Sequence, residues 1–419
     1  MKKFYSLVVV LCIACIGTVH SQQIINLGVS DGVAAKITSD YAGTSDSVIV
    51  VVPAGYTYPE YAAGAIGLAT ISTSIKKLVI KGDGTKPTLL TKGFTLPATG
   101  LTSFTVKDLM VKGIEDTGSA LAVGAGSYVI SGTFAVGSVN FTNCSISNYR
   151  GVIRMKASCS FTNLTIDKCI ISNIGGYNIL NTEGSPIPTL TNFTIKNSTV
   201  YGTNGTVFSA ATAVPGTFTI SDCTFDNLGY ASGKYLIDFG TTNTTTVLKI
   251  NNTILGKTIN AGFIGIRSGA SYTVNNSYIT SDWTTASSAV IGFTTYASAS
   301  TALFTTPTTF TCDASANAMA TVGNYTIKDA SFAGKNSAGD PRWYLGGATA
   351  VQSPNASSTV ISYNGKEISL NEAQDVTIYS VTGDLLKSAK SVTVIAVGNL
   401  SHGIYIVKAG TTVQKFIVQ

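Results

Sequence analysis

The chain has 419 residues, of which 44% are hydrophobic and only 11% are charged. This composition excludes an intrinsically disordered protein, which combines low hydrophobicity with high net charge. The formal net charge of +6 comes from scattered basic residues without a basic stripe or interleaved aromatic residues, so nucleic acid is not an expected partner. Abundant Gly, Thr, Ser and Asn favour strands and turns, which predicts an all-β protein.

Residues 1–21 have the pattern of a secretory signal peptide. Two lysines precede an apolar segment over residues 7–16, and small residues at Val19 and Ser21 predict cleavage before Gln22. The apolar segment is too short for a stable membrane span. We therefore expect a secreted or outer-surface protein that passes through the periplasm.

A lipoprotein signal ending at Cys15 is the alternative for this segment. Ala14 precedes that cysteine as the motif requires. Cys12, however, stands where the motif has Leu. The signal-peptidase site before Gln22 is therefore the preferred interpretation.

One eight-residue pattern recurs along the central region. It has apolar residues at positions 1, 3 and 8, Asn or Asp at position 5, and a small residue at position 6. Copies start at Leu78, Phe104, Val139, Leu164, Phe193, Phe218, Leu248, Tyr272 and Tyr325, and most starts are 24–35 residues apart. This period predicts a right-handed parallel β-helix of ten to twelve coils over residues 22–345. Residues 31–41 predict a short helix that covers its N-terminal edge.

The residue at position 5 predicts a sharp corner within each coil. Asn and Asp tolerate the left-handed backbone conformation, so the pattern is strand, tight turn, strand. Stacked coils would align these residues into a hydrogen-bonded ladder made of Asn143, Asn197, Asp222, Asn252 and Asn276. Position 6 holds a small residue in seven of the copies, and we expect its cysteines, Cys144, Cys169 and Cys223, to be buried as small apolar groups.

A second kind of strand follows in most coils and carries the candidate ligand-binding residues. If Ile153, Ile237 and Ile266 point inward, the alternation of a strand points Arg154, Asp238 and Arg267 outward, and Asn181 or Glu183 joins them. Stacking would form a face of Arg154, Asn181, Asp238 and Arg267 that suits an acidic sugar chain. The alternative is a solvated face with occasional charges.

The pattern changes near the C-terminus. Residues 339–345 (GDPRWYL) predict a cap on the last coil, and Trp343 offers a ring for stacking on a sugar as the alternative role. Residues 346–359 are small and polar and predict a linker. Residues 360–419 contain short alternating strands with Gly-containing turns, which predict a small antiparallel β-sandwich.

The central region resembles the pectin-lyase-like β-helix proteins. VVVPAGYTYPEY and LVIKGDG are similar to a first coil of that family, and GDPRW with the FTIxNC phrases resembles surface β-helix proteins of the Bacteroidetes. The resemblance covers residues 24–345 and implies the fold. The aspartate clusters and catalytic motifs of the lyases and polygalacturonases in that family are not found here.

The C-terminal residues resemble a type IX secretion system (Por) sorting domain. VTIYSVTGDLL, LSHGIYIVKAG and QKFIVQ match it in order and position, through Tyr379, Gly383, Leu400, Gly403, Tyr405, Val407, Gly410, Lys415 and Val418. The resemblance implies recognition by the type IX secretion machinery, removal of the tail, and attachment of many such proteins to surface lipopolysaccharide.

Two classes of function are consistent with these features. Both histidines, His20 and His402, lie outside the central region, and carboxylates there are sparse, so glycosidic hydrolysis with paired carboxylates is not indicated. We therefore expect a non-catalytic protein that binds polysaccharide or surface glycan, with no metal and no cofactor. The alternative is a polysaccharide lyase or glycoside hydrolase with an unfamiliar site.

Overall fold

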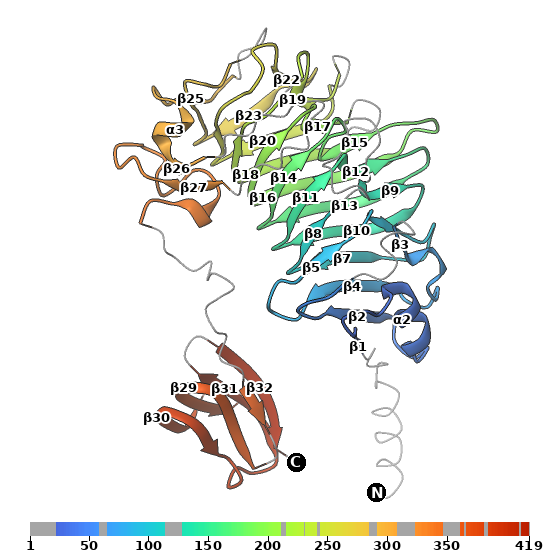
Figure 1. Cartoon of the computed structure of the whole chain (residues 1–419), viewed down its shortest axis with the longest axis vertical. Helices are drawn as coiled ribbons and strands as arrows, with labels where there is room; N and C mark the ends of the chain where they lie inside the picture. The colour runs from blue at the N-terminus through green and yellow to red at the C-terminus, as the bar shows by residue number, and fades with distance from the viewer. Residues whose placement is uncertain are drawn as a thin grey trace, which may run out of the picture. The chain divides into compact units, whose positions relative to one another are not determined.

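The computed structural model describes residues 22–57, 65–113, 128–210, 215–229, 231–240, 244–284, 291–307, 323–346, 361–363, 366–380, 384–409 and 412–418. The described residues are 52% strand and 6% helix, and the chain divides into two compact units, Met1–Val351 and Gln352–Gln419 (Figure 1). This boundary falls inside the predicted linker. The predicted signal peptide and residues 347–359 of the linker lie outside the described residues.

The first unit is a parallel β-solenoid of about nine turns. Most turns supply a first strand, a second strand beyond a corner, and a third strand on a separate sheet. The first strands are β2 (Ser47–Val52), β4 (Lys77–Gly82), β7 (Ser103–Lys107), β10 (Ala135–Thr142), β13 (Ser160–Asp167), β16 (Thr189–Thr203), β18 (Thr217–Asp226), β20 (Val247–Asn251) and β23 (Tyr272–Asn275), and β1 (Gln22–Asn26) precedes them. The fold class predicted from the repeat is confirmed.

The remaining strands of each turn follow the first strand along the chain. The second strands are β5 (Thr88–Leu90), β8 (Met110–Lys112), β11 (Ser145–Tyr149), β14 (Ile170–Ile174), β21 (Ile254–Leu255), β24 (Tyr278–Ile279) and β25 (Thr294–Thr295), and β16 and β18 run through both positions. First and second strands together form sheet A. Sheet B contains the third strands, β3 (Ile66–Gly67), β6 (Phe94–Thr95), β9 (Tyr128–Gly132), β12 (Gly151–Met155), β15 (Leu180–Thr182), β17 (Phe208–Ser209), β19 (Tyr235–Asp238) and β22 (Ile264–Arg267).

The number of turns is about nine, against the ten to twelve expected, because the chain leaves the stack after β25. The last copy of the repeat pattern forms β27 (Asn324–Ile327), which pairs antiparallel with β26 (Phe304–Thr306). Its two apolar residues, Tyr325 and Ile327, pack on Tyr201 and Ile254 of the solenoid. The last copy of the pattern therefore forms part of a hairpin that packs on the outside of the solenoid.

The predicted corners are present. Asn143, Asn197, Asp222, Asn252 and Asn276 all have φ between 43° and 54°. Three of the five side chains form the predicted ladder: Asn276 Nδ2 donates to Asn252 Oδ1 (2.9 Å), and Asn252 Nδ2 donates to Asp222 Oδ1 (2.9 Å). Asn143 and Asn197 donate instead to Asp108 and Asp167 of the preceding turn. The ladder satisfies amide groups that would otherwise be half-buried without partners.

The small residue after each corner is buried, as predicted, and it has a second role. Its side chain donates back to the carbonyl oxygen two residues earlier, as in Cys169 to Asp167 (3.4 Å), Ser198 to Lys196 (2.6 Å) and Cys223 to Ser221 (3.1 Å). Two of these carbonyls also accept a backbone N–H of the preceding turn, from Asn143 N to Asp167 O (2.9 Å) and from Lys168 N to Lys196 O (3.1 Å), so the side chain is a second donor. A small thiol or hydroxyl fits beside the corner and supplies this hydrogen bond.

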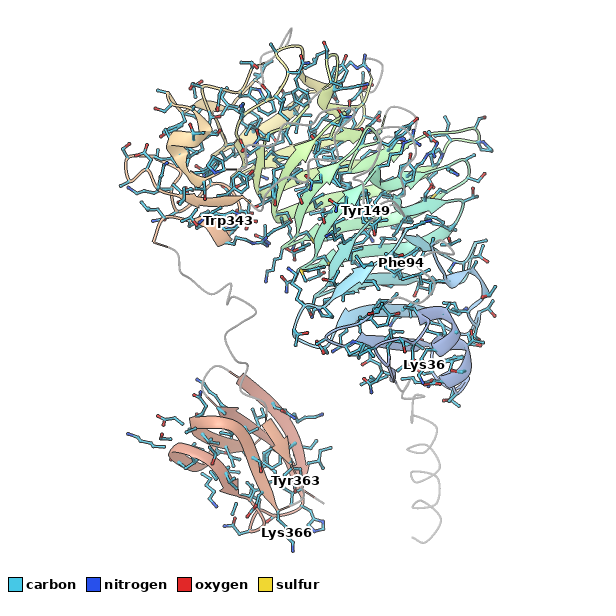
Figure 2. All side chains as sticks on the ribbon, in the orientation of Figure 1. Lys36, Phe94, Tyr149, Trp343, Tyr363 and Lys366 are labelled. Atoms are coloured by element: carbon cyan, nitrogen blue, oxygen red, sulfur yellow. The ribbon has the colours of Figure 1, made fainter. Side chains whose placement is uncertain are left out.

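Apolar rings fill the interior of the solenoid. Phe193 and Phe218 are stacked with their centroids 4.5 Å apart, and Phe208 of sheet B meets both edge-on. Tyr149 is fully buried, and its hydroxyl donates to Thr91 O (2.8 Å). Figure 2 shows Phe94 and Tyr149 among the inward side chains.

Two short helical segments lie near the N-terminal end. The predicted helix is α2 (Val33–Asp40), whose Val33 and Ile37 are buried in the solenoid core. A 3-10 turn, η2 (Leu68–Thr70), contributes the buried Leu68. The apolar residues spaced four apart in α2 explain why this segment is a helix packed on the first turns.

The second unit is an antiparallel sheet with its own core. Its strands are β28 (Ile361–Tyr363), β29 (Glu367–Ser380), β30 (Leu385–Ala396), β31 (Gly403–Ala409) and β32 (Thr412–Val418). Ile378 and Val407 are opposite each other and fully buried. The predicted separate β-domain is therefore present.

Candidate functional site

The four candidate residues lie in one row across sheet B, on its third strands. Successive strands are parallel and in register, so that Ser131, Arg154, Asn181, Ser209, Asp238 and Arg267 are neighbours in that order. We call these six residues the polar row. The residues before them on the strands, such as Ile153, Phe208 and Ile237, are fully buried, so alternation points the polar row outward. Figure 1 shows the strands β12, β15, β17, β19 and β22 that carry it.

One part of the polar row is organised around Glu183. Arg154 donates through Nε to Glu183 Oε1 (2.5 Å) and forms an ion pair with the same carboxylate. Asn181 donates through Nδ2 to Glu183 Oε2 (3.1 Å). Asn181 is only 8% exposed, so this bond fixes its amide. Glu183, which the sequence offered as an alternative to Asn181, therefore acts together with it.

The last two strands of sheet B hold a second ion pair. Arg267 donates from Nε and from a terminal nitrogen to the two oxygens of Asp238, at 2.7 and 2.6 Å. Its guanidinium also lies 4.4 Å from the centre of the Tyr235 ring. The hydrogen bond to Asp238 raises the pKa of Arg267. The pair is a rigid planar unit on the outer face of the solenoid.

The arrangement of charges suits binding better than proton transfer. Each carboxylate of this face, Glu183 and Asp238, is bonded to an arginine. The oxygens of both carboxylates therefore already accept from guanidinium groups. Glu183 follows β15, and Asp238 lies in β19, two strands further along sheet B.

Sequence reasoning missed three residues beside the polar row. Arg150 lies just before β12, with its guanidinium 3.8 Å from the centre of the Tyr177 ring. Tyr177 and Tyr128 are edge to face at 6.0 Å, and the Arg154 guanidinium is 5.1 Å from the Tyr128 ring. Tyr128 and Arg150 stand outside the outward-facing positions of the strands, so the alternation used to select candidates could not find them.

Residues 300–307 and 323–345 lie on the outer flank of sheet A. Arg342 donates to Lys168 O (2.8 Å), Gly339 N donates to Asn252 O (2.7 Å), and Trp343 Nε1 donates to Thr199 Oγ1 (2.7 Å), so the segment crosses several turns. The predicted cap on the last coil is thus a strap along the side, because its apolar residues pack on second strands. Figure 2 labels Trp343 in this strap.

Two carboxylates are buried beneath this strap. Asp340 is 2% exposed, accepts from Thr199 Oγ1 (2.7 Å), and its pKa is raised to about 6 by burial. Asp226 is fully buried and accepts from Lys257 N (2.7 Å), and burial raises its pKa to about 7. Shifted carboxyl groups are candidates for catalysis. These two are closed off by packing, which assigns them to structure.

The predicted sorting residues are placed on the second unit. Tyr379 lies in β29, Gly403, Tyr405 and Val407 in β31, and Lys415 and Val418 in β32, with Leu400 packed against the core of this unit. The Tyr405 ring packs on Phe416 at 5.6 Å, and its hydroxyl donates to Ser401 O (2.7 Å). Gly383 and Gly410 lie outside the described residues.

The described part of the chain contains no helix long and apolar enough to cross a membrane. Within the same residues, no three His, Cys, Asp or Glu side chains are grouped as a metal site would require. The chain matches no protein-family model, and no curated protein and no solved structure matches it.

Proposed function

We propose that this chain is an exported β-solenoid that binds an extended polysaccharide along the polar row without cleaving it. The observation that carries the proposal is the register of sheet B, which puts a polar side chain on each of six adjacent strands. Strands are about 4.8 Å apart, so the row extends roughly 24 Å. A chain-like ligand lying across the strands would meet a hydrogen-bonding group at every step.

The chemistry of the face supports a sugar ligand. Arg154 and Arg267 are held in fixed planes by Glu183 and Asp238, and both lie against tyrosine rings. Preorganised planar groups lose little conformational entropy when they bind hydroxyl groups. Because both carboxylates are bonded to arginines, binding is favoured over lyase or hydrolase chemistry.

A block in the middle of the polar row tests this proposal. Ser209→Trp should weaken binding of a polysaccharide, identified first on a glycan array, by at least about tenfold, because the indole covers the centre of the row. Arg267→Ala should weaken it by about ten- to a hundredfold through the loss of charged hydrogen bonds. Biolayer interferometry with the chain from Gln22 onward would measure both effects.

The matched control is Thr219→Trp, which places the same ring on the outer face of sheet A. It should leave affinity unchanged. Equal affinities for wild type, Ser209→Trp and Arg267→Ala would show that the ligand binds elsewhere. New reducing ends or unsaturated products in the bound glycan would replace the binding proposal with an enzymatic one.

Export through the type IX secretion system is the second element of the proposal. It rests on the signal-like residues 1–21 and on the match of Tyr379, Tyr405 and Lys415 to the sorting pattern. Attachment to surface lipopolysaccharide would follow from the same resemblance. In this proposal the antiparallel unit is the part that the machinery recognises, and the solenoid is its passenger.

Removal of residues 400–419 is expected to stop the chain in the periplasm, because it deletes β31 and β32 and with them the core residue Val407. Lys408→Ala, an exposed position on β31, is the control and should be exported normally. Cell fractionation followed by mass spectrometry would locate each form. A surface polypeptide that retains both Met1 and Gln419 would contradict the proposal.

A further inference from the structure

Arg150 differs from the other arginines of this protein. The sequence contains four arginines, Arg150, Arg154, Arg267 and Arg342. Three of them are ion-paired, with Glu183, Asp238 and Asp340. Among the described residues, Arg150 has neither an ion pair nor a hydrogen bond from its guanidinium, and its Nε is buried without a partner.

The surroundings of Arg150 position its guanidinium but give it no hydrogen bond. Its guanidinium lies 3.8 Å from the centre of the Tyr177 ring and 6.0 Å from that of Tyr128. Arg154 lies over the same two rings, at 5.4 and 5.1 Å. A cation–π contact stabilises the charge but accepts no N–H hydrogen bond. The two rings therefore present two guanidinium groups side by side, with only Glu183 to balance them.

Tyr128 adds a second unsatisfied donor to this cluster. It is only 8% exposed, and its buried hydroxyl has no hydrogen-bond partner. Desolvation raises its pKa, which keeps the hydroxyl protonated as a donor. Buried donors without partners are costly and rare in native proteins. A guanidinium without a carboxylate partner, together with two buried donors, is a candidate binding site for an anion.

We propose that Arg150 and the Tyr128 hydroxyl form a subsite for an anionic group, a carboxylate or a sulfate ester, on one sugar of the chain bound at the polar row. The inference rests on the proposed function and deepens it by naming the chemistry of the ligand. Arg154 connects the anion subsite with the polar row, since it belongs to the polar row and also lies against the rings of Tyr128 and Tyr177. A guanidinium presents two parallel N–H groups to such an oxyanion, and an ammonium does not.

The test compares matched polymers that differ only in charge. A sulfated glucan is paired with its unsulfated parent, and a uronate polymer with its carboxyl-reduced form. Wild type should bind the charged member of one pair about ten- to a hundredfold more tightly, and which pair shows this identifies the anion. Arg150→Gln should bind both members alike, and Arg150→Lys should recover only part of the preference.

Two controls separate this subsite from general charge effects and from misfolding. Lys249→Gln removes one positive charge from an exposed position of sheet A and should keep the preference. An unchanged melting temperature shows that Arg150→Gln is folded. Arg150→Gln with an undiminished preference, while Ser209→Trp loses binding, would overturn the subsite and leave the polar row standing.

A second measurement does not depend on any polymer. Phenylglyoxal modifies arginine side chains, and peptide mass spectrometry reports each of the four separately. Inorganic sulfate should slow modification of Arg150 several-fold and leave Arg342 unchanged. Protection of Arg150 by sulfate without polymer binding would support the subsite and refute the polar row as a polysaccharide site. Equal rates at Arg150 with and without sulfate, together with no charge preference, would refute the subsite.

Discussion

Replacement of Phe218 by alanine should lower the free energy of unfolding of the solenoid by about 3–5 kcal/mol. Phe218 is fully buried and stacked on Phe193 at 4.5 Å. It also meets Phe208 at 5.3 Å and Phe239 at 5.1 Å, so it joins both sheets across the interior. A neighbouring turn cannot move in to fill the cavity, because each turn is fixed by hydrogen bonds to the turns on either side.

Urea denaturation followed by tryptophan fluorescence would measure this loss. The two tryptophans, Trp283 and Trp343, both pack against the solenoid. Because repeat proteins are stabilised by contacts between neighbouring turns, a cavity in the middle should weaken the whole stack. Thr219→Ala, the next residue on the outer face, is the control and should change stability by less than about 0.5 kcal/mol. A loss below about 1 kcal/mol for Phe218→Ala would show that the interior re-packs.

Raising the pH from about 4 to about 7 should destabilise the solenoid by roughly 3–5 kcal/mol through Asp226. Burial raises the pKa of this carboxyl from 3.8 to about 7. The folded state therefore holds the proton more tightly than the unfolded chain. Stability is complete below pH 3.8 and is lost as the pH rises through the folded value. Asp340, with a pKa of about 6, contributes in the same direction.

The substitution Asp226→Asn should remove most of this pH dependence. An asparagine keeps an oxygen for the hydrogen bond from Lys257 N and carries no charge at any pH. Melting temperatures measured from pH 4 to 8 should fall for wild type and fall less for the variant, which keeps the contribution of Asp340. Asp108→Asn, on the partly exposed corner ladder, is the control and should follow wild type. A parallel fall for wild type and Asp226→Asn would assign the pH dependence to other groups.

The corners show which features of the backbone the local sequence determines. A single residue type at position 5 set the left-handed conformation, because that preference belongs to the residue itself. Where Lys168 replaces Asn at this position, φ is still 56°, so the stacked turns impose the corner on a residue that does not favour it. A second ladder, Asn173 Nδ2 to Asn148 Oδ1 (3.2 Å), lies before sheet B. It was missed because it comes five residues after the first corner, beyond the end of the eight-residue pattern.

The candidate site likewise combines features that the sequence predicts with features that it does not. Alternation on each strand was enough to select Arg154, Asn181, Asp238 and Arg267, and the register of sheet B brings them into one row. The pairing of Asp238 with Arg267 follows from this register, because the two residues are direct neighbours. The pairing of Arg154 with Glu183 was not predictable, because Glu183 lies beyond the end of β15.

By itself the sequence determined the parallel solenoid, its corners, the inward residues and the separate β-rich end, because these follow from short-range periodicity and residue preference. Only the tertiary structure decided that the segment at Trp343 is a strap along the flank, that Asp226 and Asp340 are buried beneath it, and that Arg150 has no carboxylate. The physical reason is that burial and charge pairing are properties of groups brought together from distant turns. The same apolar pattern at Tyr325 can complete a coil or cover one, and the free surface of the second strands selects the latter.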